Sequence, residues 1–180
     1  MCLLVSCGDD DYTPKPQGYF RIDLPKKAYV REEFNCPFSF EIPVYTNWTP
    51  DREAKGQDCW ININYPQFKG KIHLTYKPVH GNLVQYLEDA RNLTDAHIPK
   101  AVAIDETLVA DSSRDVYGLI YDVKGTGAAS TMQFFVTDSS EHFLRGALYF
   151  DVEPNNDSLA PVINFIKEDI HHLIETVEWE

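Results

Sequence analysis

The sequence predicts an α+β domain built on a mainly antiparallel β-sheet, and three observations lead to this fold class. Several runs either alternate apolar and polar residues or are apolar throughout, which is typical of strands. Most connections between these runs are short enough to be hairpins, which join antiparallel strands. Two amphipathic helical patterns interrupt and follow the strands. We therefore expect a three-layer α/β/α sandwich, with a two-layer sheet carrying both helices on one side as the alternative.

The chain opens with "MCLLVSCGDD", in which Leu4-Val5-Ser6-Cys7 fits all four positions of a bacterial lipobox. Cys7 is then the acylated residue and residues 1–6 are a signal-peptide remnant, although the usual basic region and longer apolar stretch are missing from it. The alternative is a chance match at the start of an acidic amino-terminal segment.

Residues 7–18 are expected to be a lipidated tether, because an acidic run is followed by Pro14 and Pro16, which favour an extended chain. At roughly 3.1 Å per residue, this tether can hold a domain up to about 30 Å from a surface. Residues 19–180 contain no linker or repeat and are expected to form a single α+β domain.

Cys36 and Cys59 fall inside this domain, each beside a strand-like run. In an oxidising compartment such a pair suggests a disulfide. If the runs 37–44 and 59–66 were partners in one hairpin, however, the cysteines would lie at opposite ends of it, which disfavours a bridge. A disulfide and two buried free thiols both remain open.

The runs "CWININYP" and "KIHLTYK" alternate apolar and polar residues, which predicts two half-buried strands. Their apolar sets share one face if Tyr65 lies opposite Ile72. The same register sets Ile63 opposite Leu74 and leaves a loop at Gln67–Gly70, whereas a slip of one residue would mix the faces.

The other face of this hairpin carries four polar side chains. The expected register sets Asn64 opposite His73 and Asn62 opposite Thr75. Together they can form a binding patch, but an outer face that only meets solvent is the simpler interpretation.

The segment "NLVQYLEDARNL" predicts a helix with Asn82 as its N-cap. Its apolar stripe consists of Leu83, Tyr86, Leu87, Ala90 and Leu93. Two later runs, "DVYGLIYDV" and "HFLRGALYF", are nearly continuous in apolar residues and predict central strands covered on both faces. The run "TMQFFVTD" lies between them and is expected to pair with one or both.

The carboxy-terminal segment "DSLAPVINFIKEDIHHLIETVEW" predicts a long amphipathic helix that covers the central strands. Asp157 or Ser158 can cap this helix, and Pro161 is tolerated in a first turn. Its apolar stripe consists of Leu159, Val162, Ile163, Ile166, Ile170, Leu173, Ile174 and Val177.

Bulk charge and the spacing of possible ligands limit the partners of the chain. The net charge of -12 disfavours nucleic acid, whose phosphates require a basic patch. His171 and His172 stand near Glu168 and Glu175 but off the apolar stripe, so surface ion pairs explain them better than a metal site. The loop "GTGAAS", residues 125–130, lacks the lysine of a phosphate-binding loop. We therefore predict no metal and no cofactor.

The segment "TDSSEHFLR" gathers the residue types of a serine hydrolase. These residues are Asp138, Ser139, Ser140, His142 and Arg145. A triad also needs a base within hydrogen-bond reach of the nucleophile, and neighbours in one turn rarely meet this geometry. Because Asp and Ser are favoured in turns for their bonds to nearby backbone amides, a structural turn is the preferred interpretation.

Several segments together resemble the GldD family of gliding-motility lipoproteins. The resemblance is carried by "YTPKPQGYFRIDLP", "CWININYPQFKGKIHLTYK", "DARNLTDAH", "TDSSEHFLRGALYF" and "NDSLAPVINFIKEDIHHLIETVEW". It implies a lipid-anchored envelope protein, acylated at Cys7, that is required for gliding and associated with type IX secretion machinery. It carries over no catalytic residue.

Three classes of function follow from the sequence. The first is a non-enzymatic assembly or scaffolding lipoprotein of the cell envelope, held in the outer membrane and in contact with other envelope proteins of the gliding and secretion apparatus. The second is a ligand-binding lipoprotein that uses the polar patch. The third is a hydrolase built on Ser139 or Ser140.

Overall fold

The computed structural model describes residues 22–52, 54, 56–57, 59–152 and 156–180. The expectations for residues 1–18, namely the signal-peptide remnant, the acylated Cys7 and the tether, lie outside the described residues. Within the described chain, strand pairing is antiparallel throughout and two α-helices accompany the sheets, so the α+β prediction is confirmed.

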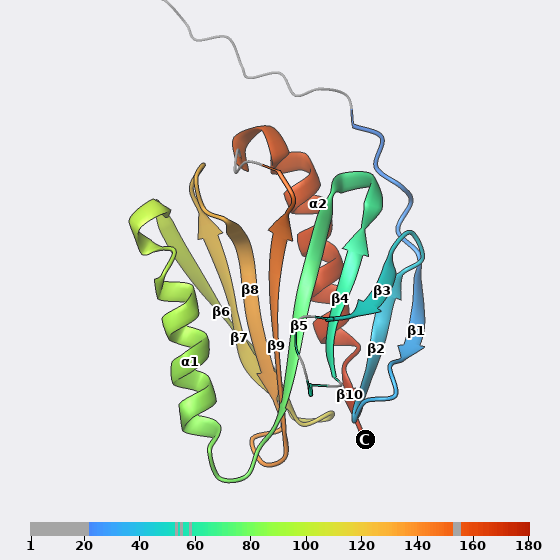
Figure 1. The fold of residues 1–180 in the computed structure, drawn as a ribbon, viewed down its shortest axis with the longest axis vertical. Helices are drawn as coiled ribbons and strands as arrows, with labels where there is room; N and C mark the ends of the chain where they lie inside the picture. The colour runs from blue at the N-terminus through green and yellow to red at the C-terminus, as the bar shows by residue number, and fades with distance from the viewer. Residues whose placement is uncertain (1–21, 53, 55, 58, 153–155) are drawn as a thin grey trace, which may run out of the picture.

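A seven-stranded sheet forms the body of the domain (Figure 1). Its strands, in spatial order, are β3 (Asn47–Pro50), β4 (Trp60–Tyr65), β5 (Gly70–Pro78), β9 (His142–Phe150), β8 (Ser130–Thr137), β7 (Val116–Lys124) and β6 (Ala103–Asp111). The expected pairing of "TMQFFVTD" is confirmed, because β8 lies between β9 and β7. Of the two expected central strands, β9 is central, whereas β7 lies next to the edge strand.

A second sheet of three strands, in the order β1 (Tyr29–Glu33), β2 (Phe38–Pro43) and β10 (Glu178–Trp179), lies beside α2 (Asn156–Glu175). This sheet and α2 cover one face of the large sheet, and the main core between them includes Phe38, Leu144 and Ile166. In Figure 1, β4 and β5 pass in front of α2.

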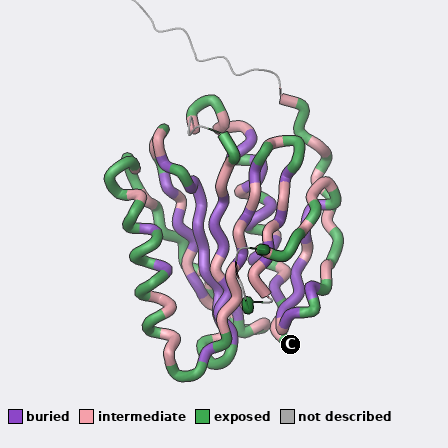
Figure 2. The backbone as a smooth tube through the Cα atoms, viewed as in Figure 1, coloured by how far each residue is buried: buried purple, intermediate pink, exposed green. Residues whose placement is uncertain are grey.

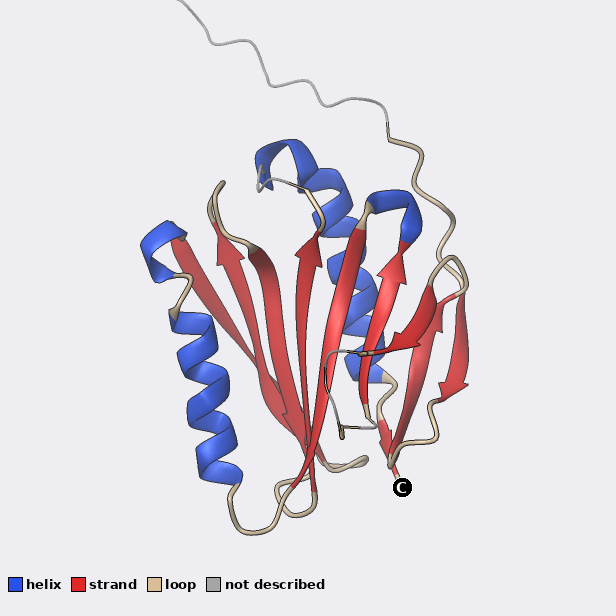
Figure 3. Cartoon of the chain, in the orientation of Figure 1, coloured by secondary structure: helices blue, strands red, loops and turns tan. Residues whose placement is uncertain are grey.

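The helix α1 (Leu83–Asp95) covers part of the opposite face of the large sheet, over a smaller core that includes Ala90, Tyr121 and Phe143. Figure 3 shows the two helices well apart, with the strands between them. This arrangement is consistent with a three-layer sandwich in which the small sheet shares a layer with α2. Figure 2 shows burial concentrated along the strands, while most of α1 is exposed.

The hairpin of β4 and β5 has a different register from the expected one. Tyr65 lies opposite Gly70 and Ile63 lies opposite Ile72, a shift of two residues. A 3₁₀ turn, Pro66–Phe68, followed by Lys69 in a left-handed conformation (φ 50°), closes the hairpin more tightly than a loop at 67–70. Because side chains alternate with a period of two, this shift leaves every side chain on its expected face.

The sequence analysis does not predict β1, β3, β6 or β10, and all four are edge strands. An edge strand needs less apolar alternation because one of its sides has no neighbour, and polar side chains there oppose aggregation. β6 illustrates this, because Leu108 is 74% exposed and Asp105 and Glu106 lie at the surface.

The helix α1 begins where expected, but Asn82 does not cap it through its side chain. Its Oδ1 accepts a hydrogen bond from the N–H of His80 at 2.9 Å, and its Nδ2 donates to the hydroxyl of Tyr86 at 2.9 Å. Leu93 is 51% exposed, so the expected apolar stripe is wrong at that position, and Thr94 is buried instead.

The helix α2 begins at Asn156, so Asp157 and Ser158 lie in its first turn instead of at the cap. Pro161 therefore lies in the second turn of the helix and not in the first. Val177 lies beyond the end of the helix but is still fully buried, so the expected stripe extends past the helix.

His172 does not form the expected ion pair with a neighbour on its own helix. Its Nε2 lies 2.7 Å from Oε2 of Glu41 on β2, and its ring stacks on Tyr29 with centroids 3.7 Å apart. The expectation is wrong for this residue because the small sheet, which the sequence analysis does not place here, provides both contacts.

A disulfide joins Cys36 and Cys59, whose Cα atoms are 5.7 Å apart. The cysteines precede β2 and β4, which belong to different sheets and are not hairpin partners. The geometric objection raised from the sequence therefore does not apply, and the bridge links the small sheet to the large one.

Asp169 is a charged residue in the middle of the apolar side of α2, and it is only 1% exposed. The ammonium of Lys27 lies 2.6 Å from Oδ1, and the hydroxyls of Tyr29 and Tyr45 each donate at 2.9 Å. Burial, together with this carboxylate, raises the pKa of both tyrosines above its ordinary value, so both stay protonated donors.

We expect Asp169→Ala to lower the free energy of unfolding by about 3–5 kcal/mol, because it leaves a partly buried ammonium and two phenols without their acceptor. The matched control is Glu168→Ala, which removes a carboxylate with a 70% exposed side chain, 3.6 Å from the same Lys27. The control should change stability by about 1 kcal/mol or less. Urea denaturation of both variants measures the difference, and equal losses would contradict the central role of Asp169.

Candidate functional site

The turn that contains Asp138 uses this carboxylate to hold backbone. Oδ1 accepts hydrogen bonds from the backbone N–H groups of Ser140, Glu141 and His142 at 3.1, 3.0 and 2.8 Å. Oδ2 accepts the hydroxyl of Ser140 at 2.8 Å. Burial would raise the pKa of Asp138, but the N–H groups of His142, Glu141 and Ser140 outweigh it and lower this pKa to about 2.

The ring of His142 is engaged elsewhere. Its Nδ1 lies 2.9 Å from the hydroxyl of Tyr76, and the ring stacks on Trp179 with centroids 5.2 Å apart. In the described chain, no hydrogen bond joins the hydroxyl of Ser139 or Ser140 to this ring. The structure therefore brings the hydrolase residue types together in one turn without arranging them as nucleophile, base and orienting acid.

The polar patch predicted on the β4 and β5 hairpin lies on the face of the sheet that α1 partly covers. The observed register sets Asn62 opposite His73, Asn64 opposite Lys71, and Thr75 opposite Trp60, so the expected pairs are wrong by one step along the face. Asn62, Asn64 and His73 line a hollow of about 530 Å³ that also includes Lys71 and Thr49–Arg52.

Within this hollow Asn64 has a structural task. Its Nδ2 donates to the backbone and side-chain oxygens of Asn47 at 3.3 and 3.1 Å and to the hydroxyl of Thr49 at 3.2 Å. These hydrogen bonds connect the short edge strand β3 to β4. By contrast, Oδ1 of Asn62 is buried without a hydrogen-bond partner.

Thr75 lies in a neighbouring hollow of about 260 Å³, which we call the α1 groove. Its lining comes from β4, β5, β9 and α1 and consists of Trp60, Thr75, Lys77, Tyr86, Asp89, Ala90, Leu93, Phe143 and Arg145. The indole of Trp60 is fixed by a 3.1 Å hydrogen bond from Nε1 to the carbonyl of Tyr76. The rings of Tyr86 and Phe143 lie 5.5 Å apart.

Arg145 is the residue of the α1 groove whose role the sequence analysis missed. The sequence groups it with the hydrolase residue types of the nearby turn, but strand alternation places it on the α1 side of β9. A signal for it exists, because it is the only charged residue in the otherwise nearly apolar run "HFLRGALYF".

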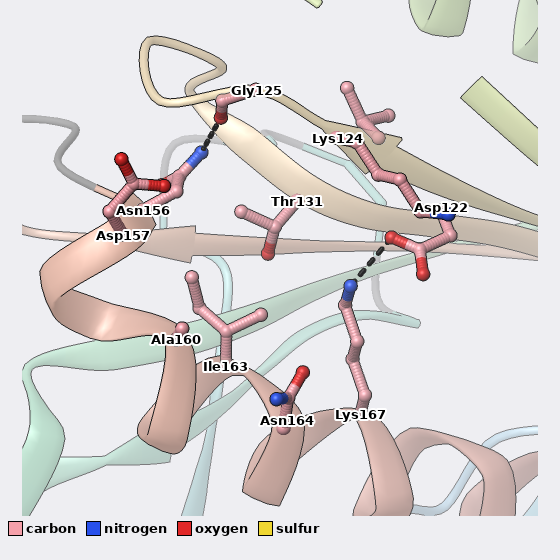
Figure 4. Close-up of a pocket in the computed structure, with 11 residues that line it drawn as sticks. Asp122, Lys124, Gly125, Thr131, Asn156, Asp157, Ala160, Ile163, Asn164 and Lys167 are labelled. Atoms are coloured by element: carbon pink, nitrogen blue, oxygen red, sulfur yellow. Dashed lines mark hydrogen bonds and ion pairs between the residues drawn. The ribbon is translucent and has the colours of Figure 1, made fainter. Parts of the chain in front are cut away.

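A third hollow, also of about 260 Å³, lies at the amino-terminal end of α2. Figure 4 shows two of its polar side chains engaged: Lys167 reaches the carboxylate of Asp122 at 2.6 Å, and Asn156 reaches the backbone carbonyl of Gly125 at 2.6 Å. The "GTGAAS" loop is thus tied to α2 through a backbone carbonyl.

Thr131 lies between these two pairs in Figure 4, and its buried hydroxyl has no hydrogen-bond partner. A β-bulge explains its direction, because three residue steps on β8, from Ser130 to Gln133, face two steps on β9, from Tyr149 to Ala147. The extra residue turns Thr131 towards α2. Of the charged groups around it, Lys167 pairs with Asp122 within the hollow and Lys124 pairs with Asp105 outside it.

The part of the chain that the structure describes contains no group of three or more His, Cys, Asp and Glu side chains placed to hold a metal ion. Neither of its helices combines the length and the apolar character needed to cross a bilayer.

Comparison with known proteins gives a match to a protein family and a likeness to solved structures. The family described as gliding motility lipoprotein GldD matches residues 9–179. The solution structure of cyanobacterial PsbP (CyanoP) from Synechocystis sp. PCC 6803 is similar with a TM-score of 0.52 and 9% identity, covering 98% of this chain and 99% of that chain. At this identity the likeness shows the fold alone. No curated protein matches the chain.

We expect Asp138→Ala to destabilise the protein most at neutral pH. The charged carboxylate, with its pKa lowered from 3.8 to about 2, stabilises the fold above pH 3.8 and loses this effect as the pH falls towards 2. The difference in free energy of unfolding between wild type and variant should therefore shrink over this range, as measured by urea denaturation at each pH. Ser139→Ala, which keeps the carboxylate, is the control, and a difference that does not depend on pH would contradict the assignment.

Proposed function

The chain belongs to the family of gliding motility lipoproteins described as GldD, and from this premise we propose that it is a non-enzymatic assembly or scaffolding component of the gliding-motility and type IX secretion machinery. Membership supports a cell-envelope location and attachment to a membrane through a lipid anchor. The proposal adds that the membrane is the outer membrane and that the partners are other envelope proteins of this apparatus.

The observation that carries the proposal is the extent of the family match. It covers residues 9–179, which include the segment after Cys7, both sheets and both helices. The whole domain is therefore the unit shared by the family, in line with a role that depends on its surface and its position in the envelope.

The proposed anchor is Cys7, at the end of "LVSC". Acylation of an amino-terminal cysteine adds several apolar chains, and at about 0.8 kcal/mol per buried methylene such chains give stable attachment where one would not. The described chain begins at Ile22 and soon reaches Lys27, which pairs with the buried Asp169. An anchor before residue 22 would thus be connected directly to the core of the domain.

A non-enzymatic role is supported by the turn at 138–142. The carboxylate of Asp138 and the hydroxyl of Ser140 are used within this turn, and the ring of His142 is used by Tyr76 and Trp179. These contacts give Asp138, Ser140 and His142 structural roles in the turn, so their presence does not require a catalytic function.

We expect Cys7→Ala to abolish labelling of the full-length protein by a clickable fatty acid in cells and to release the protein from the membrane fraction. Cys2→Ala is the matched control, since Cys2 lies in the same short segment but outside the lipobox, and it should be labelled as the wild type is. Undiminished labelling of Cys7→Ala would refute the anchor.

We expect the double variant Ser139→Ala, Ser140→Ala to support gliding and type IX secretion in cells, because neither hydroxyl is expected to act in chemistry. The melting temperature of the purified variant establishes that it folds. Loss of both cellular activities in a variant with wild-type melting temperature would contradict the scaffold role and revive the hydrolase.

A further inference from the structure

Arg145 carries a positive charge that no carboxylate of the described chain neutralises. Its guanidinium donates to Oε1 of Gln133, and the hydroxyl of Tyr149 lies near it. No Asp or Glu of the described residues lies within ion-pair distance of it. Arg145 is half-buried, so its guanidinium has lost part of its hydration, and an anion in the hollow would compensate for that loss.

The direction of the Gln133 side chain agrees with this view. Gln133 is 1% exposed, and its amide nitrogen has no hydrogen-bond partner. The opposite orientation of the amide would place this nitrogen, a donor, against the guanidinium, which can only donate. The amide oxygen of Gln133 therefore accepts a hydrogen bond from Arg145 and holds its guanidinium in place. Because this amide is neutral, it does not neutralise the positive charge of Arg145.

Among the described residues that line the α1 groove, no unbalanced negative charge lies near Arg145. Lys77 and Asp89, which also line the α1 groove, lie 3.9 Å apart and balance each other. Burial, together with the nearby Arg145, lowers the pKa of His97, so His97 is neutral at neutral pH and adds no charge. One net positive charge thus remains here, on a chain whose net charge is -12.

The walls of the α1 groove suit an apolar body beside that charge. Trp60, Tyr86 and Phe143 supply aromatic surface, and the first two are held in place by hydrogen bonds to backbone carbonyls. At about 260 Å³ the groove is slightly smaller than the pockets that hold drug-sized ligands, which favours a small molecule.

We propose that the α1 groove binds a small carboxylic acid with an aromatic or aliphatic body, whose carboxylate pairs with Arg145 and whose body lies between Trp60, Tyr86 and Phe143. A carboxylate fits better than a phosphate, because a carboxylate carries the single negative charge that one guanidinium neutralises, whereas a phosphate monoester carries nearly two at neutral pH. This site does not depend on the scaffold role, and its ligand adds a binding function to the same domain.

The test uses 3-phenylpropionate as the probe and its neutral amide, 3-phenylpropanamide, as the matched ligand without charge. Isothermal titration calorimetry of the full chain should give saturable binding of the acid with a dissociation constant of about 1 mM or lower. The amide should bind at least about tenfold more weakly, because it cannot neutralise the guanidinium.

Arg145→Met should remove the preference for the acid, whereas Arg91→Met, which removes an exposed charge from α1 outside the groove, should keep it. Arg145→Met removes an unneutralised charge but also the donor to the buried Oε1 of Gln133, so its melting temperature should fall only modestly and the variant should stay folded. Leu93→Trp provides a second test at a half-exposed position of the groove, where the larger ring should block the probe without disturbing the core.

Four results would overturn the proposal. They are no binding of the acid, equal binding of acid and amide, a preference for the acid that survives Arg145→Met, and undiminished binding to a folded Leu93→Trp variant. A fall in melting temperature of Arg145→Met with the preference kept would show that Arg145 only supports Gln133 and Tyr149.

Discussion

The buried carboxylate of Asp169 is the constraint on which the layer around α2 depends. Its donors come from three places in the chain: Lys27 precedes β1, Tyr29 opens β1, and Tyr45 follows β2. Because a buried charge without partners is very unfavourable, the small sheet cannot move away from α2 while the helix stays folded against the large sheet. The disulfide from Cys36 to Cys59 and the contact of Glu41 with His172 hold the same three parts together.

Periodicity alone predicted much of this fold, since it depends on which side chains avoid water. The alternation in "CWININYP" and "KIHLTYK" assigned every side chain of β4 and β5 to the correct face, although the register was wrong by two residues. Alternation cannot detect a register shift by an even number of residues, because such a shift keeps every side chain on the same face. Only the geometry of the turn at 66–69 determines the register. The edge strands were missed for a related reason, because polar, half-exposed strands have no strong pattern.

The candidate sites were less predictable, because they depend on contacts between segments distant in the chain. Asp169 occupies a position that the helical stripe assigns to the core, so an acidic residue there is a readable signal, but its partners lie about 120 to 140 residues away. The unneutralised charge of Arg145 could be recognised only once β9, β8 and α1 had been placed, since it rests on which acidic groups are near. The direction of the Thr131 side chain could be predicted only from the bulge in β8, and no pattern in the sequence indicates that bulge.

The position of Lys27 and β1 also determines how the domain would respond to mechanical force. If the proposed anchor at Cys7 carries the load, force enters the domain from the amino-terminal side, where the described residues 22–28 lead into β1 (Figure 1). Hydrogen bonds between antiparallel strands lie perpendicular to the strands, so a pull along β1 shears the five pairs from Tyr29 with Pro43 to Glu33 with Ser39 at the same time. Lys27 precedes this ladder in the chain, so the same pull would also load its ion pair with Asp169 on α2. β1 would then be loaded in shear, so that all of its ladder hydrogen bonds would resist the pull together.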